Sequence, residues 1–312
     1  MPSTRNGSRN AARNAAKAPL KNAEPRLSRF TPGAYFRNRT VLITGASSGI
    51  GRDLALTLAK MGAKVALMAR RKSLLESLAD EITTAGGEAL PLAADVTRRA
   101  EVRDAVDRTL ARFNRIDVLI NSAGILIPDR VETMPPEDLE RMMSVNLMGT
   151  LHTIQAVLPS MRTAGVGSIV NIASLAGRRG MPPLGAYGAT KFAVVGLTEA
   201  LRVELYGSGI CLSLVMPGVI DTPMVHGASS TQSADQAATG RDPFKLLPDS
   251  MPAMPTQWVT WAVVAAVVLG LTEVDVPPGA VVMEKIAALF PSLTDAVLAL
   301  GSRLFDWATR RP

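Results

Sequence analysis

The residues Thr40-Val-Leu-Ile-Thr-Gly-Ala-Ser-Ser-Gly-Ile-Gly51 contain the pattern from which the architecture of this 312-residue chain can be predicted. An apolar run with β-branched side chains leads through three closely spaced glycines into a helix-like run at 53–60. Glycines let backbone N–H groups approach a phosphate, and a helix N-terminus adds partial positive charge. The pattern therefore predicts a phosphate-binding turn between a strand and a helix. The alternative is a tight turn that binds nothing.

The same alternation of strand and helix continues without a break to about residue 216. Short, nearly continuous apolar runs are typical of parallel strands that are covered on both faces. Between them, residues 72–86 and 102–113 have apolar side chains at helical spacing. The pattern favours one doubly wound α/β domain over two domains. Strands are expected at 40–44, 64–69, 89–93, 117–120, 168–172 and 210–215.

The composition excludes several classes of protein and site. Apolar residues make up 47% of the chain and charged residues 20%, which is ordinary for a globular protein with a core. The one cysteine, Cys211, excludes an intramolecular disulfide framework, and we expect it to be buried in its strand. With only two histidines, His152 and His226, we expect no metal site, and we expect His152 to be structural or half exposed on its helix. Aromatic residues are 4% of the chain, too few for a base-stacking nucleic-acid surface.

The net charge of +7 belongs to the N-terminal segment. Residues 1–37 carry eight basic side chains against Glu24 alone, so the rest of the chain is neutral. Few large apolar residues lie there, and disorder is the expected state. On a helix, the basic residues that recur every four positions from Arg5 to Lys21 would form one stripe. Such a stripe would suit an anionic membrane surface or organelle targeting. No apolar signal-peptide core is present.

The glycine spacing is Gly-x3-Gly-x-Gly, which differs from the wider dinucleotide-binding fingerprint. Thr44-Gly45-x3-Gly49-x-Gly51 resembles the cofactor motif of the short-chain dehydrogenase/reductase family. Further segments match the family in order over about residues 38–280, and this ordered set makes the resemblance specific. They are Asp95-Val96, Asn121-Ser122-Ala123-Gly124 (where Ser122 replaces the family's second Asn), Asn146, Ser174, Tyr187-x3-Lys191 and Pro217-Gly218-Val219-Ile220-Asp221-Thr222.

The resemblance implies a nicotinamide dinucleotide site along these segments. It implies that Asp95 and Val96 read the adenine ring and that the turn from Pro217 to Thr222 lies beside the nicotinamide. The remaining cofactor-binding residues that it implies are Gly45, Ser47, Ser48, Gly49, Ile50, Gly51, Asn121, Ala123, Gly124, Tyr187, Lys191, Gly218, Val219 and Ile220.

Tyr187 and Lys191 are the candidates for acid–base chemistry. They are one helical turn apart and share a face. A free tyrosine has a pKa of about 10, and we expect the nearby ammonium to lower it. Tyr187 would donate a proton to a carbonyl oxygen as hydride arrives, or accept one in reverse. The resemblance further implies that Ser174 positions that oxygen, that Lys191 binds the nicotinamide ribose, and that Asn146 holds a water linking Lys191 to solvent.

The end of the second strand, Met68-Ala69-Arg70-Arg71, predicts the choice of cofactor. The family's NAD enzymes usually place an acid where Ala69 stands, and an acid would bind the adenosine ribose. Arg70 and Arg71 could instead pair with a 2′-phosphate, with help from Arg52. NADP(H) is therefore expected over NAD(H). The alternative is that these arginines are solvated.

The C-terminal third holds apolar segments without a motif. Residues 258–271 carry no charge and are too short to span a bilayer, so a buried or interface helix is expected. Residues 281–309 predict a helix interrupted near Pro291, with an apolar face that we expect to pack on the body. The alternative is that a partner or a membrane uses this face. Residues 223–255 are weakly patterned and could cover the substrate. Apolar pocket candidates there are Met224, Val225, Phe244, Leu246, Leu247, Met251 and Met254, and His226 could touch the substrate.

Together these patterns predict a basic tail at 1–37, a Rossmann-type domain with a parallel seven-stranded sheet at 38–280, and a helical extension at 281–312. The expected activity is NADP-dependent interconversion of a lipophilic carbonyl and an alcohol. Alternatives are a sugar or 3-oxoacyl thioester as substrate, or a non-catalytic NADP-binding scaffold. A homodimer or homotetramer is expected from the family resemblance. We expect a cytoplasmic protein with no nucleic-acid partner, and peripheral membrane contact stays open.

Overall fold

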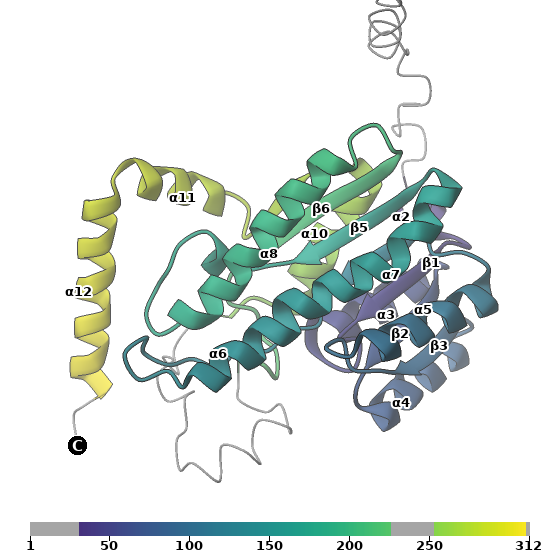
Figure 1. The fold of residues 1–312 in the computed structure, drawn as a ribbon, viewed down its shortest axis with the longest axis horizontal. Helices are drawn as coiled ribbons and strands as arrows, with labels where there is room; N and C mark the ends of the chain where they lie inside the picture. The colour runs from purple at the N-terminus through teal and green to yellow at the C-terminus, as the bar shows by residue number, and fades with distance from the viewer. Residues whose placement is uncertain (1–30, 226–252, 310–312) are drawn as a thin grey trace, which may run out of the picture.

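The computed structural model describes residues 31–225 and 253–309 (Figure 1). The strands are β1 Thr40–Thr44, β2 Lys64–Ala69, β3 Glu88–Ala93, β4 Val118–Asn121, β5 Gly167–Ile172, β6 Ile210–Pro217 and β7 Glu273–Val276. The helices are α2 Pro32–Phe36, α3 Gly49–Lys60, α4 Lys72–Thr84, α5 Arg99–Phe113, α6 Pro136–Met143, the π-helical turn η2 Ser144–Met148, α7 Gly149–Ala164, the 3-10 turn η3 Leu175–Gly177, α8 Gly185–Glu204, α10 Thr256–Leu269, α11 Ala280–Leu289 and α12 Pro291–Thr309.

The strands form one seven-stranded parallel sheet in the order β3-β2-β1-β4-β5-β6-β7. The predicted doubly wound α/β architecture is confirmed, and the six strands expected from the sequence occur with ends shifted by two residues or fewer. The last strand, β7, has four residues, and two of them, Glu273 and Asp275, are acidic. No apolar run in the sequence therefore marks this strand.

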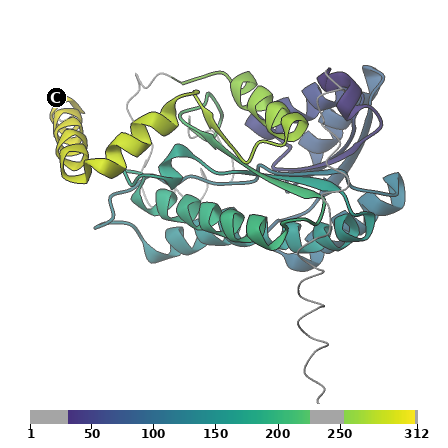
Figure 2. The ribbon, with the colours of Figure 1, turned by 90° about the horizontal axis from the view of Figure 1, so that it is seen from above.

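Helices cover both faces of the sheet, and each face has its own core (Figure 2). On one face, α3, α4 and α10 bury side chains such as Leu54, Leu75 and Val263. On the other, α5, α7 and α8 bury side chains such as Val106 and Ile154. Because helices bury both faces of the sheet, a ligand site can form only at an edge, where the strands end.

The folded body begins earlier than the sequence boundary at residue 37 suggested. Thr31 caps the short helix α2, and Phe36 at its end is fully buried in the core that contains α3 and α10. Tyr35 packs beside Phe36 with ring centroids 5.1 Å apart, and its backbone oxygen accepts a hydrogen bond from Arg39. The two aromatic residues supply the apolar surface that the preceding segment lacks. The predictions for residues 1–30 lie outside the described residues.

The chain reverses its direction of winding between β1 and β4, because β1 pairs with β2 on one side and with β4 on the other. The loops that follow these two strands diverge to opposite faces, and in such sheets a ligand crevice lies at this point. The hydroxyl of Thr44 at the end of β1 accepts hydrogen bonds from the backbone N–H groups of Ser122 and Ala123, both at 3.0 Å. These bonds fix the two loops side by side.

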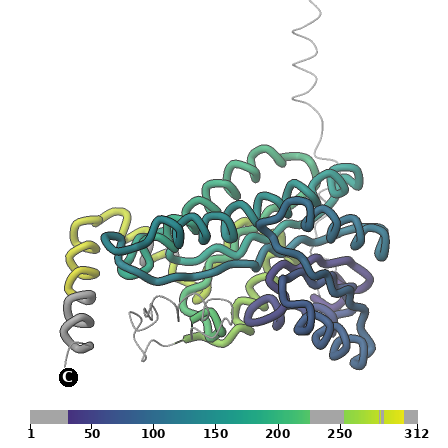
Figure 3. Tube along the Cα trace, turned by 60° about the horizontal axis from the view of Figure 1, so that its bottom comes forward, coloured from purple at the N-terminus to yellow at the C-terminus, as the bar shows by residue number. Residues whose placement is uncertain are grey.

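The two C-terminal apolar segments behave differently. Helix α10 buries one side on β6, β7 and α3, whereas Trp258 and Trp261 stay about half exposed, so the prediction of a buried or interface helix keeps both possibilities. Helices α11 and α12 also form, with the predicted interruption at Pro291, but the expectation that their apolar face packs on the body was wrong. Leu293 and Val297 remain 65% and 62% exposed. Figures 1 and 3 both show α12 standing apart from the sheet and its covering helices.

Two further expectations were tested by burial. Cys211 is only half-buried, because it lies at the start of β6, before that strand gains its second neighbour. His152 is partly buried, and its Nδ1 lies 2.9 Å from the backbone oxygen of Val96, which agrees with a structural role. None of the helices in the described part of the chain is both long and apolar enough to cross a bilayer.

Candidate active site

The glycine-rich turn follows β1 and has the backbone shape that glycine permits. Gly45 and Gly49 have φ angles of +69° and +54°, in the left-handed region. A Cβ on Gly45 would lie 2.9 Å from the backbone of Ala123, and one on Gly51 would lie 2.4 Å from the carbonyl oxygen of Gly45. The three glycines therefore let the turn, the start of α3 and the loop after β4 approach one another closely.

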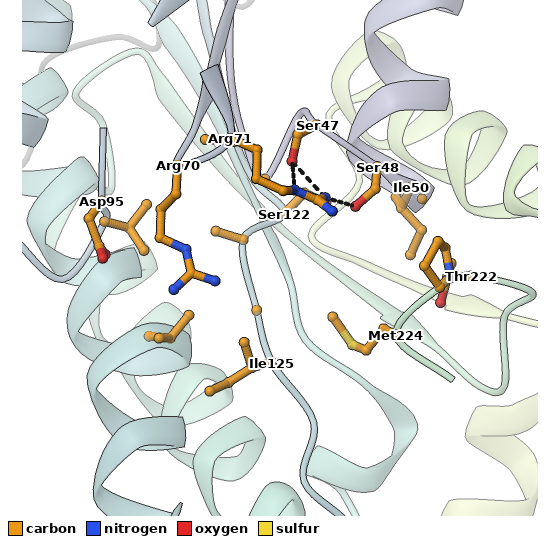
Figure 4. Close-up of a pocket in the computed structure, with 18 of the residues that line it drawn as sticks. Ser47, Ser48, Ile50, Arg70, Arg71, Asp95, Ser122, Ile125, Thr222 and Met224 are labelled. Carbon is orange, nitrogen blue, oxygen red and sulfur yellow. Dashed lines mark hydrogen bonds between the residues drawn. The ribbon is translucent and has the colours of Figure 1, made fainter. Parts of the chain in front are cut away.

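The serines of this turn are held by an arginine. Arg71 donates from Nη2 to Ser48 Oγ at 2.7 Å and to Ser47 Oγ at 2.9 Å (Figure 4). Ser48 is the N-cap residue of α3, but its side chain makes no capping hydrogen bond. The first N–H groups of α3 therefore remain available to an anion. Burial, together with the neighbouring Arg70, lowers the pKa of Arg71, because both disfavour the charged guanidinium. A bound anion would favour that charged form.

A cleft runs from these arginines along the carboxyl edge of the sheet. Arg70 extends along it toward Ile125, while Asp95 lies at its wall (Figure 4). Asp95 accepts hydrogen bonds from Thr97 and thereby shapes the loop after β3. The cleft is lined by Gly45, Ser47, Ser48, Gly49, Ile50, Ala69, Arg70, Arg71, Ala94, Asp95, Val96, Ser122, Ala123, Gly124, Ile125, Arg141, Val145, Thr222, Pro223 and Met224.

The four predicted catalytic residues are buried together beyond Gly124. Ser174, Tyr187, Lys191 and Asn146 are all less than 10% exposed. A Cβ on Gly124 would lie 3.3 Å from Asn146 Oδ1 and 3.7 Å from Lys191 Nζ. Since Gly124 also lines the cleft, no side chain at this position separates the cleft from the buried lysine and asparagine.

Hydrogen bonds fix the side chains of Ser174 and Lys191. Ser174 caps the turn η3, because its hydroxyl accepts from Ala176 N–H at 3.2 Å, and it donates to the oxygen of Pro217 at 3.3 Å. Lys191 donates from Nζ to the oxygen of Ile172 at 3.0 Å. The sequence placed Lys191 beside Tyr187 on one face of α8, and the Nζ atom lies 5.7 Å from the centroid of the tyrosine ring.

Asn146 lies in the π-helical turn η2, between α6 and α7. Its side chain exchanges hydrogen bonds with the backbone of Ile125, at 2.8 and 3.0 Å, and donates to Thr190 Oγ1 at 2.9 Å. Thr190 in turn donates to the backbone oxygen of Tyr187 at 2.8 Å. The asparagine therefore connects the loop after β4 with the helix that carries Tyr187. π-helical turns inside α-helices are frequent at functional sites.

Burial shifts the protonation of the central pair. Desolvation raises the pKa of Tyr187 to about 12, although its hydrogen bond with Ser174 acts in the opposite direction. Desolvation also lowers the pKa of Lys191 to about 8. The expectation that the ammonium of Lys191 lowers the pKa of Tyr187 was wrong for the chain without a bound cofactor. The pair is fully enclosed, so the loss of water outweighs attraction across several ångströms.

The surroundings of Tyr187 are apolar. It belongs to a buried cluster with Leu126, Ile127 and Met142, and the half-buried Met224 packs against this cluster. Sequence reasoning proposed Met224 for an apolar pocket, but it did not single out Ile125, Arg141 or Val145. Arg141 and Val145 are four positions apart, about one helical turn, and so share a face with each other, but no sequence motif marked that face.

Some predicted residues lie outside the lining of the cleft. Asn121 is buried behind it, where its amide donates to Asn171 at 2.9 Å and accepts from Thr153 at 2.6 Å. Arg52 points away and pairs with Glu81 at 2.5 Å, so its expected help was wrong. Gly51, Pro217, Gly218, Val219 and Ile220 also do not line the cleft. Val225 and Met254 do not line the cleft either, and His226, Phe244, Leu246, Leu247 and Met251 lie outside the described residues.

Within residues 31–225 and 253–309, no cluster of three histidine, cysteine or acidic side chains could hold a metal ion. The arrangement instead offers positive charge and free helix N–H groups at one end of the cleft and a buried acid–base pair at the other. The glycine cradle and the two arginines fit a phosphorylated dinucleotide that lies along the carboxyl edge.

Comparisons with known proteins agree with this geometry. The family model described as short chain dehydrogenase matches residues 39–233. An uncharacterized oxidoreductase of Staphylococcus saprophyticus is 39% identical over 189 residues, which are 60% of this chain and 81% of that protein. The D-beta-hydroxybutyrate dehydrogenase of Rhizobium meliloti is 36% identical over 203 residues, which are 64% of this chain and 77% of that protein.

Solved structures are similar over most of the chain. A short chain dehydrogenase/reductase from Burkholderia phymatum, in complex with NAD, superposes with a TM-score of 0.74 at 26% identity over 83% of this chain and 96% of its own. A 3-ketoacyl-(acyl-carrier-protein) reductase from Brucella melitensis, complexed with NADH, superposes with a TM-score of 0.65 at 30% identity over 77% of this chain and 98% of its own.

Proposed function

This chain belongs to the short-chain dehydrogenase/reductase family, and on that basis we propose that it is an NADP-dependent enzyme that interconverts a lipophilic carbonyl compound and its alcohol, with Tyr187 as the acid–base group. The family is one of oxidoreductases that act on CH–OH groups, and its members use NAD(P) and a small-molecule substrate. The observation that carries the proposal is the burial of Ser174, Tyr187, Lys191 and Asn146 next to a cleft that fits a dinucleotide.

The proposed roles follow from the hydrogen bonds. When bound, the cofactor supplies the hydride. Tyr187, whose pKa is about 12, is a neutral phenol at pH 7 and can donate its proton to a carbonyl oxygen. Ser174 lies beside the phenol and can bind the same oxygen. Lys191 spends one N–H on Ile172 and has two more for ribose hydroxyls. Asn146 holds the loop after β4 against α8 and keeps Gly124 beside Lys191.

The preference for NADP rests on the end of β2. Ala69 offers no carboxylate to a ribose, whereas Arg71 lies against Ser47 and Ser48 at the mouth of the glycine turn. A 2′-phosphate would gain charge-assisted hydrogen bonds from a guanidinium held in this place. The two solved relatives contain NAD and NADH, so the proposal assigns this chain the opposite preference.

The lipophilic substrate class rests on the lining near Tyr187. Ile125, Leu126, Met142 and Met224 place apolar surface around the phenol, which favours a substrate that can be desolvated there. The similarity to a 3-ketoacyl-(acyl-carrier-protein) reductase supports a second candidate, a 3-oxoacyl thioester. Both candidates present a ketone on an apolar chain, and they differ in the group attached next to it.

We also propose that the chain works as a homodimer or homotetramer in the cytoplasm. Trp258 and Trp261 on α10 and Phe192 on α8 are about half exposed, and exposed large apolar side chains of this kind suit contacts between copies. The molar mass of the purified chain in solution, measured by light scattering, tests this proposal.

Steady-state kinetics on a panel of carbonyl compounds tests the proposed activity. We expect turnover of medium- and long-chain ketones with NADPH, and a kcat/KM at least about tenfold lower with NADH. Turnover of 3-oxoacyl pantetheine esters above that of simple ketones would select the second candidate. Activity on polyols alone would contradict the lipophilic substrate. No turnover by folded protein that binds NADPH would favour a scaffold.

A further inference from the structure

Helices α11 and α12 form a C-terminal arm with an exposed apolar surface. The arm begins at Ala280, after β7, and turns at Pro291. On α11 the exposed residues recur every three or four positions, as they do on α12, so each helix carries a stripe. The stripe residues are between 49% and 74% exposed: Val282, Ile286, Leu289, Leu293, Val297 and Leu300.

The arm lies at the edge of the sheet that carries the active site. All seven strands are parallel, so their carboxyl ends meet at one edge. The glycine turn, Ser174 and Thr222 follow the carboxyl ends of β1, β5 and β6, and the arm follows the carboxyl end of β7. Figure 1 shows the arm projecting beyond this edge.

A basic residue ties the arm to its own body. Arg179 donates to the backbone oxygen of Pro291 at 3.3 Å and forms an ion pair with Asp295. Arg179 lies in the segment between Ser174 and Tyr187, which enters the active site at both ends. Its neighbour Arg178 binds Glu273 on β7 at 2.5 Å and so holds the same segment to the sheet. These contacts join the start of α12 to the segment between Ser174 and Tyr187.

The composition of the stripe favours a lipid surface as its occupant. A stable protein–protein interface uses roughly 20–30 residues on each side, and the stripe offers six. Residues 280–309 contain five charged side chains, none of them a stripe residue: Glu284, Lys285, Asp295, Arg303 and Asp306. Shallow insertion of a short apolar stripe needs neither a complementary groove nor charge pairs.

The second signal for a lipid surface is the charge of the N-terminal residues. Residues 1–30 carry seven basic side chains and one acidic one, while residues 31–312 have a net charge of only +1. Stable binding to a bilayer commonly takes two signals, an apolar one and a basic one. Each basic residue near an anionic surface adds to the attraction.

We propose that the stripe on α11 and α12 docks the protein on an anionic lipid bilayer, with the carboxyl edge of the sheet facing the membrane. The docking is independent of the proposed reaction, but it would bring a lipophilic substrate to the mouth of the cleft. Because no helix in the described residues, α11 and α12 included, is both long and apolar enough to cross a bilayer, the proposed contact is peripheral.

Vesicle flotation of the full chain tests this proposal. The probe is phosphatidylcholine vesicles with about one-third phosphatidylglycerol, compared with pure phosphatidylcholine vesicles. We expect the wild type to float with the anionic vesicles and the variant Leu293→Gln/Val297→Gln to bind them at least about tenfold less, because it loses two inserted apolar side chains. Glutamine keeps the helix propensity of α12.

The matched control is Val203→Gln/Tyr206→Gln. These two side chains are 77% and 88% exposed. Val203 lies in the last turn of α8 and Tyr206 just beyond its end, at the opposite, amino edge of the sheet. The control should float like the wild type. Equal flotation of the α12 variant, or no flotation of the wild type, would overturn the proposal. So would a fall in solution molar mass in the α12 variant, which would assign the stripe to a second copy.

A second measurement needs no variant. Hydrogen exchange of wild-type protein should show amides of residues 282–300 protected by anionic vesicles and unchanged by the same lipids at high salt, where the basic residues are screened. Unchanged exchange with vesicles at low salt would contradict docking through the arm even if the substitutions damaged the fold.

Discussion

The two ends of the cleft are built from different kinds of group. At the end near Arg71, hydroxyls, helix N–H groups and two guanidinium groups face the space where a phosphate fits. At the end near Tyr187, apolar side chains enclose one phenol and one ammonium. The first end can recognise a ligand by charge in the presence of water. The second sets protonation by excluding water, so burial there matters more than direct pairing.

The largest effect is expected from Tyr187→Phe, which removes the only proposed proton donor and leaves the apolar cluster intact. We expect kcat to fall by a factor of about 10²–10⁴, the usual contribution of general acid–base catalysis, while the dissociation constant for NADPH stays unchanged. Stopped-flow hydride transfer and NADPH fluorescence measure the two quantities.

Tyr206→Phe is the control for this change, because Tyr206 is 88% exposed and lies at the opposite edge of the sheet. It should leave both quantities at their wild-type values. If Tyr187→Phe kept more than about half of the wild-type kcat, another group would have to donate the proton, and the dry end of the cleft would lose its assigned role.

Burial of Lys191 should make the stability of the protein depend on pH. Its pKa is about 8 in the folded chain and about 10.5 when unfolded. Between these values the unfolded lysine keeps a proton that the folded one has released, so the free energy of unfolding should rise with pH in this window. The full rise is about 3 kcal/mol for one group, at about 1.4 kcal/mol for each pKa unit.

Urea unfolding of the wild type and Lys191→Met from pH 7 to 10 measures this effect. The unfolding free energy of the wild type minus that of Lys191→Met should rise by up to about 3 kcal/mol as the pH rises. Lys72→Met is the control, because this side chain is 73% exposed beside Glu76 and should give a flat difference. A flat difference for Lys191→Met would mean that the lysine is solvated.

At the other end of the cleft, Arg71→Ala should change cofactor choice more than catalysis. Loss of charge-assisted hydrogen bonds to a 2′-phosphate predicts an NADPH dissociation constant about 10–100-fold higher, with little change for NADH. Arg52→Ala is the control, because Arg52 begins α3 beside the same turn but pairs with Glu81 on the surface.

Equal weakening of NADPH and NADH by Arg71→Ala would show that the arginine supports the glycine turn through Ser47 and Ser48 and does not read the phosphate. The charged end of the cleft would then be a structural support for α3. Cofactor choice would have to be sought elsewhere along the cleft.

The sequence predicted most of the fold because the strands are buried on both sides and so appear as apolar runs. β1, β4 and β5 are such strands, whereas β7 carries Glu273 and Asp275 at the edge of the sheet and was missed. Phe36 was assigned to the tail because a single buried aromatic residue in a basic segment carries no periodic signal.

The candidate site was predicted as a set of residues but not as an environment. The motifs name Tyr187 and Lys191, yet the pKa values of both depend on burial, and Tyr187 is buried among Leu126, Ile127 and Met142, which come from distant loops and helices. Likewise, an apolar stripe on a helix predicts a contact surface, but the sequence pattern does not identify the surface that covers it. The stripe on α12 is the example, since the body does not cover it.

The smallest effect is expected from Met224→Ala, which tests how the apolar end selects its substrate. A Cβ on Gly124 would lie 3.9 Å from the Met224 methyl, and the same side chain packs on the cluster around Tyr187. Shortening this side chain should raise the ratio of kcat/KM for branched ketones to kcat/KM for linear ketones by about tenfold or less. The effect is limited because only one side chain's apolar contact and volume are lost.

Met61→Ala is the matched control, because Met61 is also half-buried but packs on the core beside the far end of α3. It should leave the branched-to-linear ratio unchanged, whatever it does to stability. If Met224→Ala changed the KM for NADPH and not this ratio, Met224 would belong to the cofactor-binding end of the cleft. The boundary between recognition by charge and recognition by exclusion of water would then lie between Met224 and Tyr187, deeper in the protein than the lining of the cleft suggests.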